Sequence, residues 1–189
     1  MKRNYVFLAD GFEEMEAVAT IDILRRAGLC VEVVSAKKDT LEVIGAHGIT
    51  IVAQEGLDKV DPDLADWMIV PGGMDGTSNL AANEKVGKLL KDHFAKGGKL
   101  AAICAAPAVV LAPLGILKDY EATVYPGMED ACRKGGAKML NIPVVTDRNL
   151  ITGNGPASAM EFAMAIVSNT VGVAAEREVG AGLLYSRDY

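Results

Sequence analysis

Cys104 is the residue whose position best suits nucleophilic chemistry. It follows the apolar run 99–103 and precedes segment 105–111, whose short side chains indicate a helix start. A strand-to-helix turn exposes the residue at the turn and directs the free N–H groups and positive dipole end of the helix at its side chain, which favours the thiolate. The N–H groups of Ala105 and Gly73 are then available to an oxyanion. The competing interpretation is a buried core cysteine.

Glu16 is the candidate partner of this thiol. It has no Lys or Arg three or four positions later, whereas Asp22 has Arg25 and Arg26 at pairing distance. A buried, unpaired carboxyl favours its protonated form, which can donate a hydrogen bond to a thiolate or shuttle a proton to a substrate. Alternatively, the acidic run 13–16 simply complements a helix N-terminus.

The histidines do not support a cysteine hydrolase, which usually needs a histidine base. The chain has only two, His47 and His93. We expect His93 on a helix surface and His47 at the rim of a pocket, so peptidase and glutaminase activities are disfavoured. Phosphate-loop, dinucleotide and zinc-protease motifs are absent from the sequence, which gives no support for a cofactor or a metal.

Composition indicates one acidic globular domain over residues 1–189. Half of the residues are hydrophobic, the net charge is -6 and the pI is near 5.0, which argues against a nucleic-acid footprint. Three cysteines without a C-x-x-C pair indicate neither a disulfide framework nor a zinc site. The N-terminal apolar run is too short for a signal peptide or a membrane span, so we expect a cytoplasmic protein.

Short, continuous apolar runs alternate with helical patterns, which predicts a three-layer α/β/α sandwich around a mostly parallel sheet. The expected strands are 5–8, 31–35, 67–70, 99–103, 122–124, 144–146 and 150–152. The expected helices are 13–27, 84–96, 105–114, 129–135 and 156–171. Segment 41–52 indicates a small hairpin, and 147–149 a tight turn between antiparallel strands.

Four segments follow strand ends in this arrangement: 10–16, 71–73, Cys104 and 153–156. Each alone is ordinary α/β loop structure. Because ligands bind beyond the carboxyl ends of the strands, together the four predict one crevice.

The residues that fill these segments resemble the ThiJ/PfpI superfamily. The match runs in order through ADGFEEME (9–16), IDILRRAG (21–28), VPGG (70–73), AAICAAP (101–107) and GPASAMEFA (155–163). The combination of EEME with AAICAAP resembles its Parkinson-protein-like (DJ-one) branch in particular. Segment 173–179 is similar to the extra C-terminal helix of that branch, whose fold is flavodoxin-like.

The resemblance implies roles for individual residues. Cys104 would be the reactive, oxidisable thiol and Glu16 its protonated partner. Backbone lining would come from Gly72, Gly73 and Ala105. The pocket would include Tyr125, Asn154, Gly155, Pro156 and His47. The resemblance also implies a homodimer through the first helix, with Arg26 near the interface.

Two positions depart from the family pattern. Tyr125 stands where several relatives have histidine, and Asn154 where some have arginine. A phenol donates hydrogen bonds but is a poor base near neutrality, so Glu16 would have to carry the proton transfers.

The hypothesis is therefore a glyoxalase-type or deglycase enzyme without a cofactor, acting on small α-oxoaldehydes or glycated adducts. Cys104 would form a hemithioacetal and Glu16 would move protons. The alternative is a redox sensor or chaperone that uses a Cys104 sulfinate. Less favoured are an inert binding module, an intracellular peptidase and a role in thiazole monophosphate biosynthesis. The sequence leaves open the physiological substrate and the roles of Cys30 and Cys132.

Overall fold

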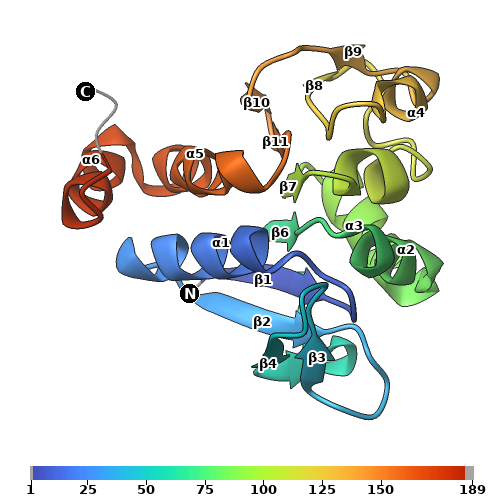
Figure 1. The fold of residues 1–189 in the computed structure, drawn as a ribbon, viewed down its shortest axis with the longest axis horizontal. Coiled ribbons are helices and arrows are strands. Elements are labelled where there is room, and N and C mark those ends of the chain that lie inside the picture. Colours follow the sequence, from blue (N-terminus) through green and yellow to red (C-terminus); the bar gives the residue numbers. More distant parts are fainter. Residues whose placement is uncertain (1, 186–189) are drawn as a thin grey trace.

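The computed structural model describes residues 2–185, and its centre is a seven-stranded sheet in the order β10-β11-β7-β6-β1-β2-β5 (Figure 1). All neighbouring strands pair in parallel except β10 and β11. The strands are β1 (Arg3–Leu8), β2 (Val31–Ser35), β5 (Glu55–Gly56), β6 (Ala65–Val70), β7 (Lys99–Ile103), β10 (Val144–Asp147) and β11 (Leu150–Gly153). The predicted α/β class is confirmed.

Helices cover both faces of the sheet, because alternate side chains of the buried strands enter two separate cores. In β1, Val6 and Leu8 belong to one core, and Tyr5 and Phe7 to the other. The first core is closed by α1 (Glu14–Arg26), α5 (Ala159–Val171) and α6 (Val173–Gly182). The second is closed by α2 (Met74–Ala82), α3 (Glu84–Ala95), the π-helical turn η2 (Pro107–Leu111) and α4 (Glu129–Lys134).

Several local predictions are confirmed. The hairpin consists of β3 (Glu42–Ile44) and β4 (Thr50–Val52), which pair antiparallel. A tight turn joins β10 to β11, and α6 is the expected C-terminal helix. Two short 3-10 helices are present, η1 (Leu57–Lys59) after β5 and η3 (Pro156–Ser158) before α5. Among the described helices, none is both long and apolar enough to cross a bilayer.

The predicted strand 122–124 is wrong. The chain there forms only β8 (Glu121–Ala122), which pairs in parallel with β9 (Lys138–Met139) in a separate two-stranded sheet. The backbone N–H groups that follow do not bond to a neighbouring strand. Thr123 N–H donates to the Thr152 hydroxyl, and Tyr125 N–H donates to the Cys104 carbonyl. This segment therefore lies over the end of the main sheet instead of extending it.

Two helix predictions also need correction. The predicted helix 105–114 is the π-helical turn η2, since Pro107 cannot donate a backbone hydrogen bond and Ala112 N–H reaches back five residues to its carbonyl. Helix α2 was not predicted, because Gly76, Thr77 and Ser78 are weak helix formers. Gly76 is required there: a Cβ would lie 2.7 Å from the Phe12 backbone.

His93 is buried and not on the helix surface as predicted. Its Nε2 lies 3.2 Å from the Asp66 carbonyl, and its ring packs where a Cβ on Gly98 would stand. Burial lowers the pKa of His93. Asp66 and Gly98 adjoin the starts of β6 and β7, whereas Cys104 follows the end of β7, so His93 is at the wrong end of the sheet to act on that thiol.

Candidate functional site

Cys104 occupies a left-handed turn directly after β7. Its φ is 64°, a conformation that few non-glycine residues adopt and that costs about 1–3 kcal/mol. Two backbone hydrogen bonds hold it there: Cys104 N–H donates to Gly153 O at 2.9 Å, and Tyr125 N–H donates to Cys104 O at 3.0 Å. The predicted strand-to-helix elbow is present, but the expected exposed thiol is not, since only 8% of Cys104 is accessible.

Glu16 lies on the first turns of α1 and is completely buried beside this thiol. Its Oε2 accepts a hydrogen bond from Gly72 N–H at 2.7 Å, and the Cys104 sulfur lies beside this oxygen, close enough for each group to affect the pKa of the other. Its other oxygen, Oε1, has no hydrogen-bond partner among the described residues. The predicted contact between Glu16 and Cys104 is therefore present.

Gly72 allows that contact. A Cβ on Gly72 would lie 2.4 Å from Glu16 Oε2, 2.5 Å from Cys104 Cβ and 3.1 Å from Cys104 Sγ. Real Cβ atoms do not approach so closely, so only glycine lets the carboxyl and the sulfur meet over the end of β6.

Two backbone N–H groups, those of Gly73 and Ala105, lie near enough to the sulfur to act against the rise in the pKa of the Cys104 thiol. Gly73 has φ 91° and immediately precedes α2, a backbone conformation that favours glycine. Both N–H groups therefore adjoin the sulfur, which leaves their predicted role toward an oxyanion as a prediction.

The thiol of Cys104 is harder to ionise than the sequence predicts. Burial raises the pKa of Glu16 to about 7, against the opposing effect of its Gly72 hydrogen bond. Burial and the nearby Glu16 charge raise the pKa of Cys104 to about 12, and the Gly73 and Ala105 N–H groups offset only part of this. Burial changes these pKa values more than the helix N-terminus does. Near neutrality Glu16 can therefore act as a base, and the sulfur keeps its proton.

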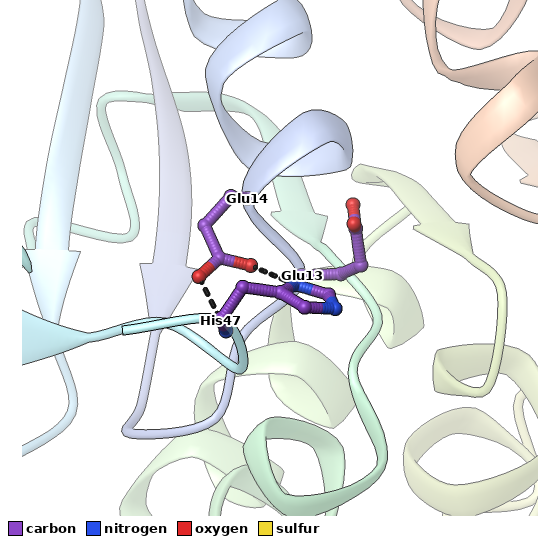
Figure 2. Close-up of side chains that lie close together, drawn as sticks. All are labelled: Glu13, Glu14 and His47. Carbon is purple, nitrogen blue, oxygen red and sulfur yellow. Dashed lines mark hydrogen bonds and ion pairs between the residues drawn. The ribbon is translucent and has the colours of Figure 1, made fainter. Parts of the chain in front are cut away.

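The three acidic residues at the start of α1 have three different roles. Glu13 is the N-cap, and its Oε2 accepts from Glu16 N–H at 2.8 Å. Glu14 instead binds the hairpin loop, accepting from His47 N–H at 2.6 Å and pairing with His47 Nδ1 at 2.9 Å. Figure 2 shows the Glu13 carboxylate directed away from that of Glu14. The helix-cap alternative holds for Glu13, and the thiol-partner hypothesis fits the contacts of Glu16.

Glu13, Glu14 and His47 also have ligand atoms within 4.8 Å of one another, a spacing compatible with a metal ion. Glu14, however, already accepts hydrogen bonds from the hairpin, including one from Ile49 N–H at 3.4 Å. A Cβ on Gly45 would lie 2.3 Å from Glu14 Oε1, so this carboxylate fits closely against the loop. We interpret the cluster as the attachment of the hairpin to α1.

Four of the five predicted pocket residues lie in two loops near Cys104, and the fifth, His47, does not. Tyr125 is bound through its N–H to the Cys104 carbonyl, and its half-exposed ring lies 3.4 Å from where a Cβ on Gly155 would be. Asn154 N–H donates to Pro143 O, and Pro156 begins η3. These loops follow β8 and β11. His47 belongs to the hairpin and contacts Glu14.

Arg26 pairs with Asp22 at 2.6 Å on the exposed side of α1, as its spacing predicts. The same expectation for Arg25 is wrong. Its guanidinium donates to Val31 O and to Gln54 Oε1, because it reaches over the start of β2.

Sequence reasoning missed the steric need for glycine at position 72 and the attachment of Glu14 to the hairpin. Neither leaves a local signal, because both depend on segments distant in the chain. The turn before α2, with two successive glycines after a strand, was the one available hint of the first.

A left-handed cysteine after a central parallel strand, with a buried acid and two N–H donors at its sulfur, defines an α/β protein of the nucleophile-elbow type. The chain belongs to the DJ-1/PfpI family, whose model matches residues 2–169.

Relatives cover most of the chain. It is 37% identical to Protein dj-1beta of Drosophila melanogaster, over 97% of both chains, and 39% identical to the glutathione-independent glyoxalase DJR-1.2 of Caenorhabditis elegans, over 85% of this chain and 83% of that one. It is 41% identical to Protein DJ-1 homolog B of Arabidopsis thaliana, but spans only 37% of that longer protein.

Solved structures of DJ-1 proteins have the same fold as this chain. Oxidized Toxoplasma gondii DJ-1 superposes with a TM-score of 0.92 at 34% identity, covering 98% of this chain and 100% of that one. Drosophila melanogaster DJ-1beta gives a TM-score of 0.92 at 36% identity, covering 98% of each chain.

Proposed function

We propose that this chain is a cofactor-independent glyoxalase-type enzyme that converts α-oxoaldehydes to 2-hydroxy acids. The observation that carries the proposal is the meeting of Cys104, Glu16 and two N–H donors around Gly72. Membership of a family that includes a glutathione-independent glyoxalase supports it.

In the first step, the Glu16 carboxylate accepts the thiol proton as the sulfur attacks the aldehyde carbon. A carboxyl with a pKa of about 7 is suited to this role near neutrality. The S–C bond forms, the carbonyl electron pair moves to oxygen, and the Gly73 and Ala105 N–H groups stabilise the oxyanion. Protonation of that oxygen by Glu16 gives a hemithioacetal and restores the carboxylate.

The second step is an internal redox shift. The carboxylate removes the C–H proton of the former aldehyde carbon, a C=C bond forms as the electron pair of the neighbouring C=O moves to its oxygen, and that oxygen takes up a proton to give an enediol. The hydroxyl on the former aldehyde carbon then loses its proton as its C=O bond forms. Return of the proton to that neighbouring carbon leaves a thioester of the 2-hydroxy acid. One carbon is oxidised and its neighbour reduced, so no external electron acceptor is needed. Water then cleaves the thioester and regenerates the thiol.

The proton transfers fall to Glu16 because neither histidine is a suitable base. His47 is bound to Glu14, and His93 lies at the opposite end of the sheet. Tyr125 adjoins Cys104 but carries a phenol, which can orient a carbonyl through a hydrogen bond. The same reasoning disfavours a cysteine peptidase.

The test compares lactate formation from methylglyoxal by the wild type, Cys104→Ala and Glu16→Gln. We expect each variant to lose about a hundredfold or more in kcat, since each removes a nucleophile or general base. Equal rates in all three proteins would contradict the proposal. A deglycase activity would require that glycated substrate still be consumed when free methylglyoxal is scavenged.

The second candidate function is redox sensing, favoured by the two backbone N–H groups that adjoin the sulfur. Two equivalents of hydrogen peroxide would convert the thiol to a sulfinate and release two waters, and these N–H groups and a protonated Glu16 would bind its oxygens. Intact mass after mild peroxide treatment tests this. A gain of two oxygens at Cys104 without measurable aldehyde turnover would favour the sensor, and an unmodified Cys104 would exclude it.

A further inference from the structure

Glu13 stands at the N-cap of α1, about one helical turn before Glu16. Its Oε2 accepts the Glu16 backbone N–H at 2.8 Å, and its own N–H donates to Gly72 O at 3.0 Å. Gly72 N–H in turn donates to Glu16 Oε2 at 2.7 Å. One continuous set of hydrogen bonds therefore joins the three residues, and Glu13 holds the backbone of the other two.

Capping alone does not explain a glutamate at this position. N-caps are most often Ser, Thr, Asp or Asn, and Ser, Thr and Asn bind a first-turn N–H without carrying a charge. Glu13 is buried, with 8% of its surface accessible, and Glu16 is completely buried. Two carboxyl groups placed together away from water are unfavourable when both are ionised. The negative charge of Glu13 therefore calls for a role beyond that of a cap.

That charge acts on the carboxyl group of Glu16. Burial is the largest cause of the raised pKa of Glu16, and the negative charge of Glu13 raises this pKa further. The Gly72 N–H and the Cys104 side chain act in the opposite direction. Loss of the Glu13 charge should therefore let Glu16 ionise at a lower pH.

The other charged groups at this end of the sheet do not act on Glu16 in this way. His47, from the hairpin, pairs with Glu14 Oε2 at 2.9 Å, and Figure 2 shows the Glu13 carboxylate directed away from that of Glu14. Asp75 and Glu161, in the first turns of α2 and α5, do not contribute to the pKa of Glu16. Within residues 2–185, Glu13 is thus the acid whose charge raises the pKa of Glu16.

We propose that Glu13 is a positioning residue for the base: its carboxylate fixes the helix turn that carries Glu16, and its charge makes Glu16 keep its proton to a higher pH. The inference rests on the proposed role of Glu16 in the Cys104 reaction. There Glu16 must accept the thiol proton and then give it to the oxyanion, and both transfers are fastest when the pKa of the base is near the working pH. Glu13 acts through Glu16 and not on the reacting atoms.

The direct test is a ¹³C NMR titration of the Glu16 carboxyl, assigned with Glu16→Gln. Glu13→Gln keeps an oxygen that can cap the helix but removes the charge, so the Glu16 pKa should fall by about half a pH unit or more. Glu84→Gln is the matched control, because it removes an acid from the first turn of α3. It should leave the Glu16 pKa within about a fifth of a pH unit of wild type. An unchanged Glu16 pKa in Glu13→Gln would overturn the proposal.

Two more variants separate charge from capping. Glu13→Asp keeps the charge and is a favoured N-cap, so its Glu16 pKa should stay closer to wild type than to Glu13→Gln. A fall as large as in Glu13→Gln would overturn the role of the charge. Glu13→Ala lacks an acceptor, so the Glu16 N–H should exchange with solvent about tenfold faster or more. Wild-type protection in Glu13→Ala would overturn the role of the cap.

The pH profile of lactate formation from methylglyoxal distinguishes this inference from the proposed function. The rise of kcat/KM with pH should move to lower pH in Glu13→Gln by the same amount as the NMR value. If the wild type forms no lactate but the NMR shift is found, the proposed function fails and the coupling of Glu13 to Glu16 stands. If the wild type is active and Glu13→Gln moves neither the profile nor the NMR value, the function stands and this inference is overturned.

Discussion

The conformation and the protonation state of Cys104 are determined by the groups packed around it. Its left-handed backbone is held by hydrogen bonds to Gly153 and Tyr125, and the N–H groups of Gly73 and Ala105 adjoin its sulfur. The buried carboxyl group of Glu16 lies beside this sulfur. A thiol in this setting is activated by proton transfer to its neighbour when it reacts, not by ionisation beforehand.

Gly72→Ala should damage the site without changing any chemical group. The new Cβ would overlap Glu16 Oε2 and Cys104 Cβ, so we expect a stability loss of about 1–3 kcal/mol and loss of activity. Gly182→Ala is the matched control, because a Cβ there meets nothing within 4 Å. Urea unfolding and lactate formation measure both effects. An active, fully stable Gly72→Ala protein would contradict the close packing.

Glu16 should make stability depend on pH. Its folded pKa of about 7 exceeds the ordinary value of 4.5, so its contribution is complete below about pH 4.5 and is lost as the pH rises through 7. Over that range the wild type should lose up to about 3 kcal/mol more unfolding free energy than Glu16→Gln, which cannot ionise. Urea titrations of both proteins at about pH 5 and about pH 8 measure the difference. Parallel losses would show that Glu16 is not the titrating group.

Single residues were predictable where a local pattern reported their environment. The strand-to-helix junction identified Cys104, and the lack of a local cation identified Glu16. His93 was misplaced because its helical spacing does not reveal the Asp66 carbonyl that satisfies it when buried. The raised pKa of Cys104 was missed for a related reason: helix position is visible in sequence, and depth of burial is not.

At the scale of elements, the β3–β4 hairpin is attached to α1 chiefly through Glu14. This carboxylate accepts the backbone N–H groups of His47 and Ile49, and Gly45 N–H is bound within the loop to Ile49 O. The hairpin thereby fixes the helix start from which Glu16 projects toward Cys104.

Glu14→Ala should loosen the hairpin selectively. The His47 and Ile49 amides lose their acceptor, so we expect both to exchange with solvent about tenfold faster or more, while amides in β6 and β7 keep their protection. His47→Ala is the control, because it removes only the ring contact and should leave Ile49 nearly unchanged. Amide exchange measured by NMR decides the matter, and equal protection in Glu14→Ala and wild type would contradict the attachment.

The main strands and longer helices were predictable because their apolar runs and end glycines are local signals. Helix α2 was missed because it forms from weak helix formers packed tightly against the loop before α1. Segment 122–124 has a strand-like composition, but Thr123 N–H bonds to the Thr152 hydroxyl instead of to a strand. Tertiary contacts override local preference in both cases.

At the scale of the whole molecule, α1 presents a stripe to solvent that contains Met15, Val18, Asp22 and Arg26. An apolar pair followed by an ion pair, on a helix whose opposite face is buried, is suited to an interface. We propose that two copies of this chain associate through this stripe.

Val18→Asp should dissociate that dimer, because a two-fold axis places both new charges in the same interface. Ile142→Asp is a matched control, since Val18 is 48% exposed and Ile142 is 47% exposed, on a different part of the surface. Sedimentation velocity should show a monomer for Val18→Asp and a dimer for the control and the wild type. A dimeric Val18→Asp protein, or a monomeric wild type, would contradict the proposal.

The central claim is that Glu16 acts as the base for Cys104 in converting an α-oxoaldehyde. The most direct measurement is the pH profile of kcat/KM for lactate formation from methylglyoxal by the wild type and Glu16→Gln. We predict that the wild-type value rises through an apparent pKa of about 7 as Glu16 ionises, and that this limb disappears in Glu16→Gln. A wild-type profile that is flat across this range, or one that Glu16→Gln reproduces, would contradict the account.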